Sequence, residues 1–205
     1  MKSLLAACCL VTLWATAPLH AQALPAFYDV SGVASDDVLN VRAAPGVGNS
    51  IVAKLNSDAT FIEVVALDDS REWARVNVDE TSGWVALRFL ARRAGQPDDQ
   101  LPRPLICAGT EPFWSLDVAG TASATLDRMD EDPVTVSTLD PVTSENRTDH
   151  YAIFGQGPSQ VATFMFQRDA CTDGMSDRHY GISVDLFVTE GSGVTYLTGC
   201  CSLSR

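Results

Sequence analysis

Short stretches in which apolar and polar residues alternate follow one another along most of this chain. Before residue 90 they are rich in valine and isoleucine, and they cover residues 38–42, 51–55, 60–67, 72–78 and 83–87. Alternation with a period of two is typical of half-buried β-strands. Several short strands at such close spacing predict a small barrel, because barrel closure also protects the sheet edges.

The β-like pattern continues after residue 104, with clusters of Gly, Asp, Pro and Ser between the strands. We expect strands over residues 113–118, 121–126, 134–139, 161–167, 182–188 and 194–197. A helical period of 3.6 residues is not apparent in either part. The fold class is therefore predicted to be all-β, with an antiparallel β-barrel or sandwich as the second part.

Residues 91–104, with the sequence ARRAGQPDDQLPRP, separate these two parts. Three prolines, a glycine and several charges leave little to bury, so this segment is predicted to be an exposed linker. It divides the chain into a first domain over residues 24–90 and a second over residues 105–205.

The first 23 residues have the three regions of a secretory signal peptide: a basic start at Lys2, an apolar run over 4–15, and Ala21-Gln22-Ala23. Cleavage is expected after Ala23, with a cut after Ala21 as the alternative. The apolar run is too short to span a bilayer. We therefore expect a periplasmic or secreted protein without a membrane span in the mature chain.

The formal net charge of −12 narrows the choice of partners. Binding to nucleic acid depends on many basic contacts to phosphate, so nucleic acid is not expected as a partner. Anionic lipid surfaces are disfavoured for the same reason. The simplest interpretation of the acidity is solubility outside the cytoplasm.

The mature chain would keep four cysteines, namely Cys107, Cys171, Cys200 and Cys201. An even number in an oxidising compartment favours disulfides, and four cysteines allow three pairings. Neighbouring residues of a strand point to opposite faces. Cys200 and Cys201 are therefore better suited to bonding two different partners, Cys107 and Cys171, than to redox chemistry.

Three segments of the first domain carry a family resemblance. They are LNVRAAPG over 39–46, WARV over 73–76 and GWVA over 83–86. In order and spacing they resemble bacterial SH3-like domains, across roughly residues 28–90. The resemblance implies an SH3-like barrel, which in exported bacterial proteins often serves as a cell-wall or peptide-binding attachment.

The candidate binding groove of this domain consists of Asn40, Arg42, Trp73 and Trp84. Asn40 and Arg42 alternate with apolar residues and are expected to face away from the core. Aromatic faces suit peptide or sugar contacts, so both tryptophans are groove candidates. The competing interpretation is that they fill the core of a small barrel; it is favoured for Trp84 and evenly balanced for Trp73.

The second domain has its own motifs: CAGTEPFW over 107–114, CTDGMSDR over 171–178 and GCC over 199–201. They resemble an uncharacterised family of exported bacterial proteins with a Glu-Pro-Phe-Trp segment, a Cys-x-Asp-Gly-Met-Ser-Asp segment and a terminal Gly-Cys. The resemblance implies no established activity. By looser analogy of fold, related domains are similar to lipocalin-like barrels.

The candidate site of this domain consists of Glu111, Trp114, Asp173 and Asp177. The segment from Asp173 to Asp177 lacks the alternating acids of known calcium loops. The mature chain offers only His150 and His179 as histidine ligands for zinc, and its cysteines are expected in disulfides, so no metal or cofactor is expected. Glu111 with either aspartate would make a carboxylate pair of the kind used in glycoside hydrolysis. The favoured alternative is that the aspartates stabilise turns.

Together these patterns predict an exported, non-catalytic binding or accessory protein of the bacterial cell envelope. Its partner would be the peptide of peptidoglycan or an envelope protein. Two alternatives stay open, an envelope hydrolase that uses the carboxylates of the second domain, and a purely structural or stress-protective periplasmic protein.

Overall fold

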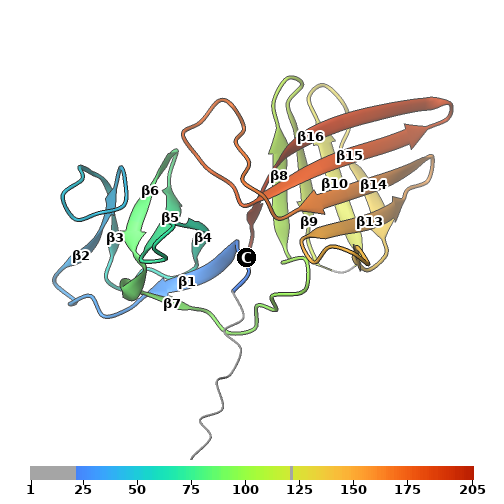
Figure 1. Ribbon diagram of the computed structural model, residues 1–205. Coiled ribbons are helices and arrows are strands. Elements are labelled where there is room, and N and C mark those ends of the chain that lie inside the picture. The colour runs from blue at the N-terminus through green and yellow to red at the C-terminus, as the bar shows by residue number, and fades with distance from the viewer. Residues whose placement is uncertain (1–21, 121) are drawn as a thin grey trace, which may run out of the picture.

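The computed structural model describes residues 22–120 and 122–205. These residues form two separate antiparallel sheets and one short 3-10 helix, η1 (Leu87–Phe89), and they contain no α-helix (Figure 1). The all-β prediction is therefore confirmed. The signal peptide predicted over residues 1–23 lies almost entirely outside the described residues and stays a prediction.

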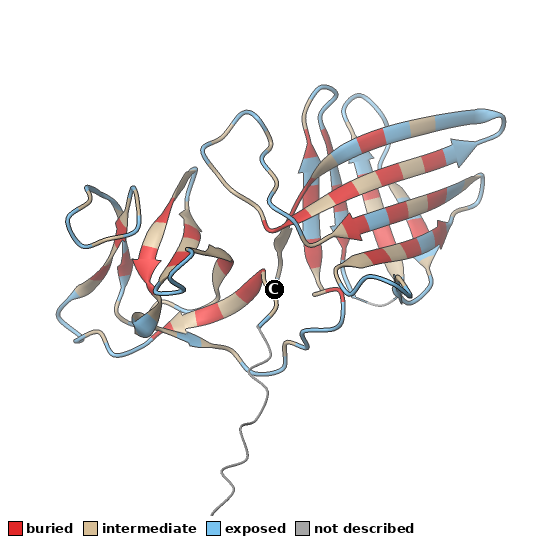
Figure 2. Ribbon diagram, viewed as in Figure 1, coloured by how far each residue is buried: buried red, intermediate tan, exposed pale blue. Residues whose placement is uncertain are grey.

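The first sheet has seven strands, in the spatial order β3 (Ile51–Asn56), β2 (Val38–Arg42), β6 (Thr81–Ala86), β5 (Trp73–Val78), β4 (Ile62–Leu67), β1 (Ala26–Val30) and β7 (Leu90–Arg92). One face of this sheet encloses a small apolar core that includes Val41, Val64, Val76 and Val85. Buried and less buried residues alternate along its strands (Figure 2). This is the pattern from which the strands were predicted.

The second sheet has nine strands, in the order β11 (Val134–Thr138), β10 (Ser123–Arg128), β9 (Trp114–Val118), β8 (Leu105–Gly109), β16 (Gly193–Leu203), β15 (Ile182–Glu190), β14 (Gln160–Gln167), β13 (His150–Gln156) and β12 (Val142–Thr143). Strand β11 also pairs with β13, at Ser137↔Gln156 and Thr138↔Gly155. This pairing closes eight of the strands into a barrel. Of the two architectures predicted, barrel or sandwich, the barrel is the one formed.

Large apolar side chains occupy the interior of the barrel. Phe164 and Phe166 from β14 pack there with Leu116 from β9 and Leu186 from β15, and each is at most 1% exposed. The interior of the barrel is therefore filled by its own side chains. Binding surfaces have to be sought on the outside of this barrel.

Most predicted strands lie within two residues of the observed ones, but five strands were missed. These are β1, β7, β8, β12 and β13. The last strand, β16, is also much longer than the predicted 194–197, since it continues through Cys200 and Cys201 to Leu203. It gains this length by pairing with β8, an interaction between chain segments far apart in the sequence.

The segment over residues 91–104, predicted to be an exposed linker, is partly buried and makes contacts with both sheets. It begins inside β7, and Leu101 is 6% exposed within the barrel core. Gln96 donates a hydrogen bond to the carbonyl of Phe27 (2.9 Å) and accepts one from its N–H (2.6 Å). The Arg168 guanidinium donates to the carbonyl oxygens of Gln100 (2.7 Å) and Leu24 (2.9 Å). The segment is therefore attached to both sheets.

Candidate binding groove and the junction between the sheets

Three of the four groove candidates lie together. Strand β2 buries Leu39 and Val41 and turns Asn40 and Arg42 outward, as the alternation predicts. Asn40, Arg42 and Trp73 line one cavity of about 340 Å³. This cavity is open to solvent, so the three side chains are available to a ligand.

Two residues that the sequence analysis did not single out, Arg88 and Phe89, line the same cavity. The Arg88 guanidinium carbon lies 4.6 Å from the centroid of the Phe89 ring. The Arg42 guanidinium is held by a hydrogen bond of 2.7 Å to the carbonyl of Asn49. The groove thus presents two arginines and two aromatic rings, because η1 brings Arg88 and Phe89 beside β2.

Trp84 lies outside the lining of this cavity. It is half-buried and absent from the apolar core, so the favoured interpretation as a core residue does not hold. The Arg75 guanidinium carbon lies 4.7 Å from the Trp84 ring centroid. Burial lowers the pKa of Arg75, and its Nε has no hydrogen-bond partner among the described residues. Trp84 therefore supports an arginine that faces the second sheet.

The loop between β14 and β15 contacts the outer face of the first sheet. Asn77 donates to the carbonyl of His179 (2.7 Å) and accepts from its N–H (3.1 Å). The Arg75 Nη1 lies 3.1 Å from His179 Nδ1. Burial and the Arg75 charge both lower the pKa of His179, which favours the neutral imidazole. The loop that carries the CTDGMSDR segment is therefore part of an interface.

Two further contacts extend this interface. Arg178 donates to the carbonyl of Asp79 (2.8 Å), and Thr81 forms a parallel β-bridge with Asp177. On the other side of the loop, the N–H of Leu203 donates to a carboxylate oxygen of Glu63 (3.0 Å). The C-terminal strand of the barrel thus contacts the first sheet directly.

Glu63 is a half-buried glutamate at this junction. Burial raises its pKa to about 7, although the hydrogen bond from Leu203 and the charge of Arg178 act in the opposite direction. A carboxyl with such a pKa is partly protonated at neutral pH. No pattern in the sequence around Glu63 signals this, because its burial depends on the second sheet.

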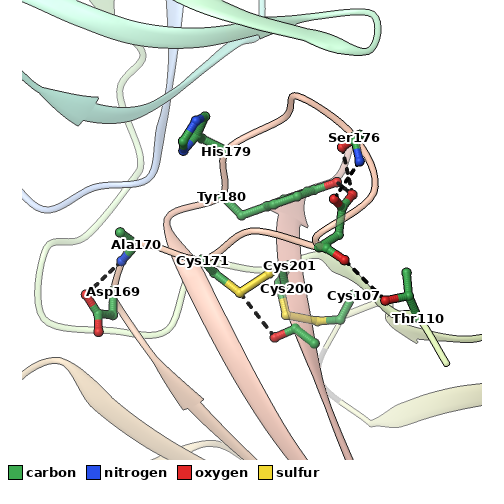
Figure 3. The surroundings of a disulfide bond; sticks show 12 residues. Cys107, Thr110, Asp169, Ala170, Cys171, Ser176, His179, Tyr180, Cys200 and Cys201 are labelled. Carbon is green, nitrogen blue, oxygen red and sulfur yellow. Dashed lines mark hydrogen bonds between the residues drawn. A yellow bond between two sulfur atoms is a disulfide. The ribbon is translucent and has the colours of Figure 1, made fainter. Parts of the chain in front are cut away.

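Two disulfides join the motifs of the barrel (Figure 3). Cys107 pairs with Cys201 inside the barrel core, and Cys171 pairs with Cys200 on the outer side of β16. The prediction that the adjacent cysteines bond two different partners is confirmed. The second disulfide attaches the β14–β15 loop to the barrel, and this is the loop that contacts the first sheet.

Asp173 organises the same loop. Its carboxylate accepts hydrogen bonds from the N–H groups of Met175 (3.0 Å) and Ser176 (2.9 Å), and from the hydroxyls of Ser176 (2.7 Å) and Tyr180 (3.1 Å). Partial burial raises the pKa of Asp173, but these hydrogen bonds outweigh it and lower the pKa to about 2. The carboxylate stays ionised and fully engaged, as expected of a residue that stabilises a turn.

Trp114, the aromatic candidate of the second domain, is only 5% exposed and belongs to the barrel core. Its ring lies against Gly109 and Gly199. A β-carbon at Gly199 would collide with the carbonyl oxygen of Ala108 and lie 2.7 Å from Cζ2 of Trp114. The glycines of both motifs are therefore needed so that the tryptophan can approach the backbone.

This packing leads to a stability prediction. Gly199→Ala is expected to lower the free energy of unfolding by about 2–3 kcal/mol, because the methyl group overpacks the Trp114 site. Gly48→Ala is the matched control, since a β-carbon there meets no atom within 4 Å, and it should change stability little. Urea unfolding of both variants measures the difference. Equal stabilities would contradict the proposed packing.

The remaining candidates of the second domain are only partly brought together. Asp173 and Asp177 line a cleft of about 570 Å³ with Thr110 and Phe113, whereas Glu111 and Trp114 lie outside its lining. Glu111 therefore does not share this cleft with either aspartate, as a catalytic carboxylate pair would need to do. Among the described residues, no group of three or more His, Cys, Asp and Glu side chains is placed to hold a metal ion.

Comparison with known proteins identifies the family to which most of the first sheet belongs. Residues 37–91 match the family model described as Bacterial SH3 domain. This part of the chain is a bacterial SH3 domain. No curated protein and no solved structure matches the chain. The resemblance stated for the motifs of the second domain stays a prediction.

The SH3 domain and the two disulfides fit an extracytoplasmic protein, and the SH3 domain suggests binding to the cell wall or to a protein. Within the part of the chain that the structure describes, no helix has the length and apolar character needed to cross a membrane.

Proposed function

We propose that this protein is an exported, non-catalytic binding or accessory protein of the bacterial cell envelope. In this proposal the groove of the SH3 domain contacts the peptide of peptidoglycan or a protein partner. The observation that carries the proposal is the cavity that joins Asn40, Arg42 and Trp73 on a domain of this family.

The chemistry of the groove suits an extended peptide. The Asn40 amide offers both a donor and an acceptor to a peptide backbone, and the Trp73 ring offers a flat apolar surface. Arg42 and Arg88 supply donors for a carboxylate. The lining also includes one acidic residue, Asp37, so the two arginines leave the groove with a net positive charge in a chain whose net charge is −12. Such a groove is suited to a ligand that carries negative charge.

The two alternative functions have less support. A hydrolase built on Glu111 and Asp173 would need both carboxyls at one cleft, but Glu111 lies outside the cleft lining and Asp173 is engaged in holding its turn. A purely structural role would be favoured by burial of both tryptophans of the SH3 domain. Trp73 and Trp84 are instead half-buried.

Retention on purified peptidoglycan tests the proposal. Trp73→Ala is expected to reduce the retained fraction about tenfold, because a central aromatic contact of the groove is lost. Trp84→Ala is the comparison variant, since it removes a tryptophan of the same domain that does not line the cavity. It should keep most of the retention.

Intact folding of both variants is checked by circular dichroism. Undiminished retention of Trp73→Ala would exclude this groove as the wall-binding surface. If the wild-type protein itself is not retained, wall binding is wrong, and a search for protein partners of the groove follows.

A further inference from the structure

Two large apolar side chains on separate loops are exposed at the same cleft. Phe113, in the turn between β8 and β9, is 45% exposed, and Met175, in the loop between β14 and β15, is 66% exposed. Both line the cleft of about 570 Å³ beside the β5–β6 turn of the SH3 domain. Single exposed apolar residues are ordinary, but a cluster drawn from distant loops indicates a contact surface.

The loops that carry these side chains are held in place. The Thr110 hydroxyl donates to the carbonyl of Asp173 (3.1 Å), which connects the two loops (Figure 3). The disulfide between Cys171 and Cys200 attaches the second loop to β16. A surface whose backbone is already ordered loses less conformational entropy when a ligand binds.

The charge around the cleft has one sign. Glu80, Asp173 and Asp177 line it, and neither lysine nor arginine is among the described residues that do. The nearest arginine in sequence, Arg178, donates to the carbonyl of Asp79 and lines a different cavity, beside Glu63. The cleft therefore attracts positive charge and repels negative charge.

We propose that this cleft docks an extended cationic polypeptide segment in which apolar side chains alternate with lysine or arginine. The apolar side chains pack against Phe113 and Met175, and the basic groups pair with Glu80 and Asp177 at the edge of the cleft. This site lies on other loops than the SH3 groove and does not depend on its function. Charge complementarity selects a cationic segment over an acidic one.

Isothermal titration of the purified protein tests the site. The probe is a blocked hexapeptide of alternating lysine and leucine, and the comparison peptide has glutamate in place of lysine. Phe113→Ser and Glu80→Gln are each expected to weaken binding of the cationic peptide by roughly tenfold. The acidic peptide is expected not to bind, and added salt should weaken the binding of the cationic one.

Matched variants show whether the binding is local. Phe154→Ser removes a phenylalanine with the same exposed fraction, 45%, from the outside of the barrel, and Glu190→Gln removes an exposed carboxylate from β15. Both should leave the affinity unchanged within about twofold, as expected for sites away from the contact.

Three results would overturn the proposal. The first is no binding of the cationic peptide, or equal binding of the acidic one. The second is equal weakening by Phe113→Ser and Phe154→Ser, which would show non-specific adsorption. The third is an affinity that Glu80→Gln weakens and Phe113→Ser does not, which would show a purely electrostatic site.

Discussion

Simultaneous replacement of Cys107 and Cys201 by alanine is expected to lower the free energy of unfolding by about 4–5 kcal/mol. This disulfide joins residues 94 positions apart, and a cross-link that closes a longer loop restricts the unfolded chain more strongly. It also lies in the barrel core, so its removal leaves a gap beside packed side chains. Urea unfolding measured without reductant gives the value.

The matched comparison is the replacement of Cys171 and Cys200 by alanine. That disulfide spans 29 positions and fastens a surface loop, so we expect a smaller loss, about 3–4 kcal/mol. A larger loss in this second variant would contradict the assignment of Cys107–Cys201 as the main cross-link of the barrel. Far-UV circular dichroism before unfolding establishes that both variants have folded.

Glu63 is expected to make the protein less stable as the pH rises from about 5 to 8. Its pKa is 4.5 in the unfolded chain and about 7 in the folded protein, so the folded state holds the proton more tightly. The stabilisation from this group is fully present below pH 4.5 and is lost as the pH rises through 7. The full shift corresponds to roughly 3 kcal/mol.

Glu63→Gln isolates this effect, because glutamine resembles the protonated carboxyl and can still accept the hydrogen bond from Leu203. The variant and the wild-type protein should have similar stability at pH 5, and the variant should be more stable at pH 8. Glu190→Gln, at an exposed position, should follow the wild-type pH dependence. Parallel curves for wild type and Glu63→Gln would show that Glu63 titrates normally.

This pH effect arises at the junction between the two sheets, where Glu63 of β4 meets Leu203 of β16. The same junction contains His179, bonded to Asn77, and the Arg75 side chain stacked on Trp84. The residues next to each of these groups in the sequence give no sign of a shifted pKa. Their altered chemistry comes from the partner sheet, so it was not predictable from local patterns.

The local features of the fold were predictable because they depend on neighbouring residues only. Alternation along 38–42 predicted both the strand and the outward direction of Asn40 and Arg42. Adjacent cysteines point to opposite faces of a strand, so two different partners for Cys200 and Cys201 followed directly. The SH3 signature likewise depends on a continuous stretch of chain.

Missed strands and misjudged side chains have a common physical reason. The sequences of β8 and β13 do not alternate regularly between apolar and polar residues. These strands form because β8 pairs with β16 and β9, and β13 pairs with β14. Trp114 was a site candidate in the sequence, but the glycines at positions 109 and 199 admit its ring into the core. Both outcomes depend on segments that are distant along the chain.

The amino-acid sequence by itself determined the all-β class, the SH3 domain and the outward placement of Asn40 and Arg42. Only the tertiary structure decided which partner each of the adjacent cysteines takes, the burial of Trp114, the raised pKa of Glu63, and the set of residues that form the groove and the cleft. The physical reason is that alternation with a period of two shows which face of a strand is buried. It does not show which other segment of the chain covers that face, because that segment is distant in the sequence.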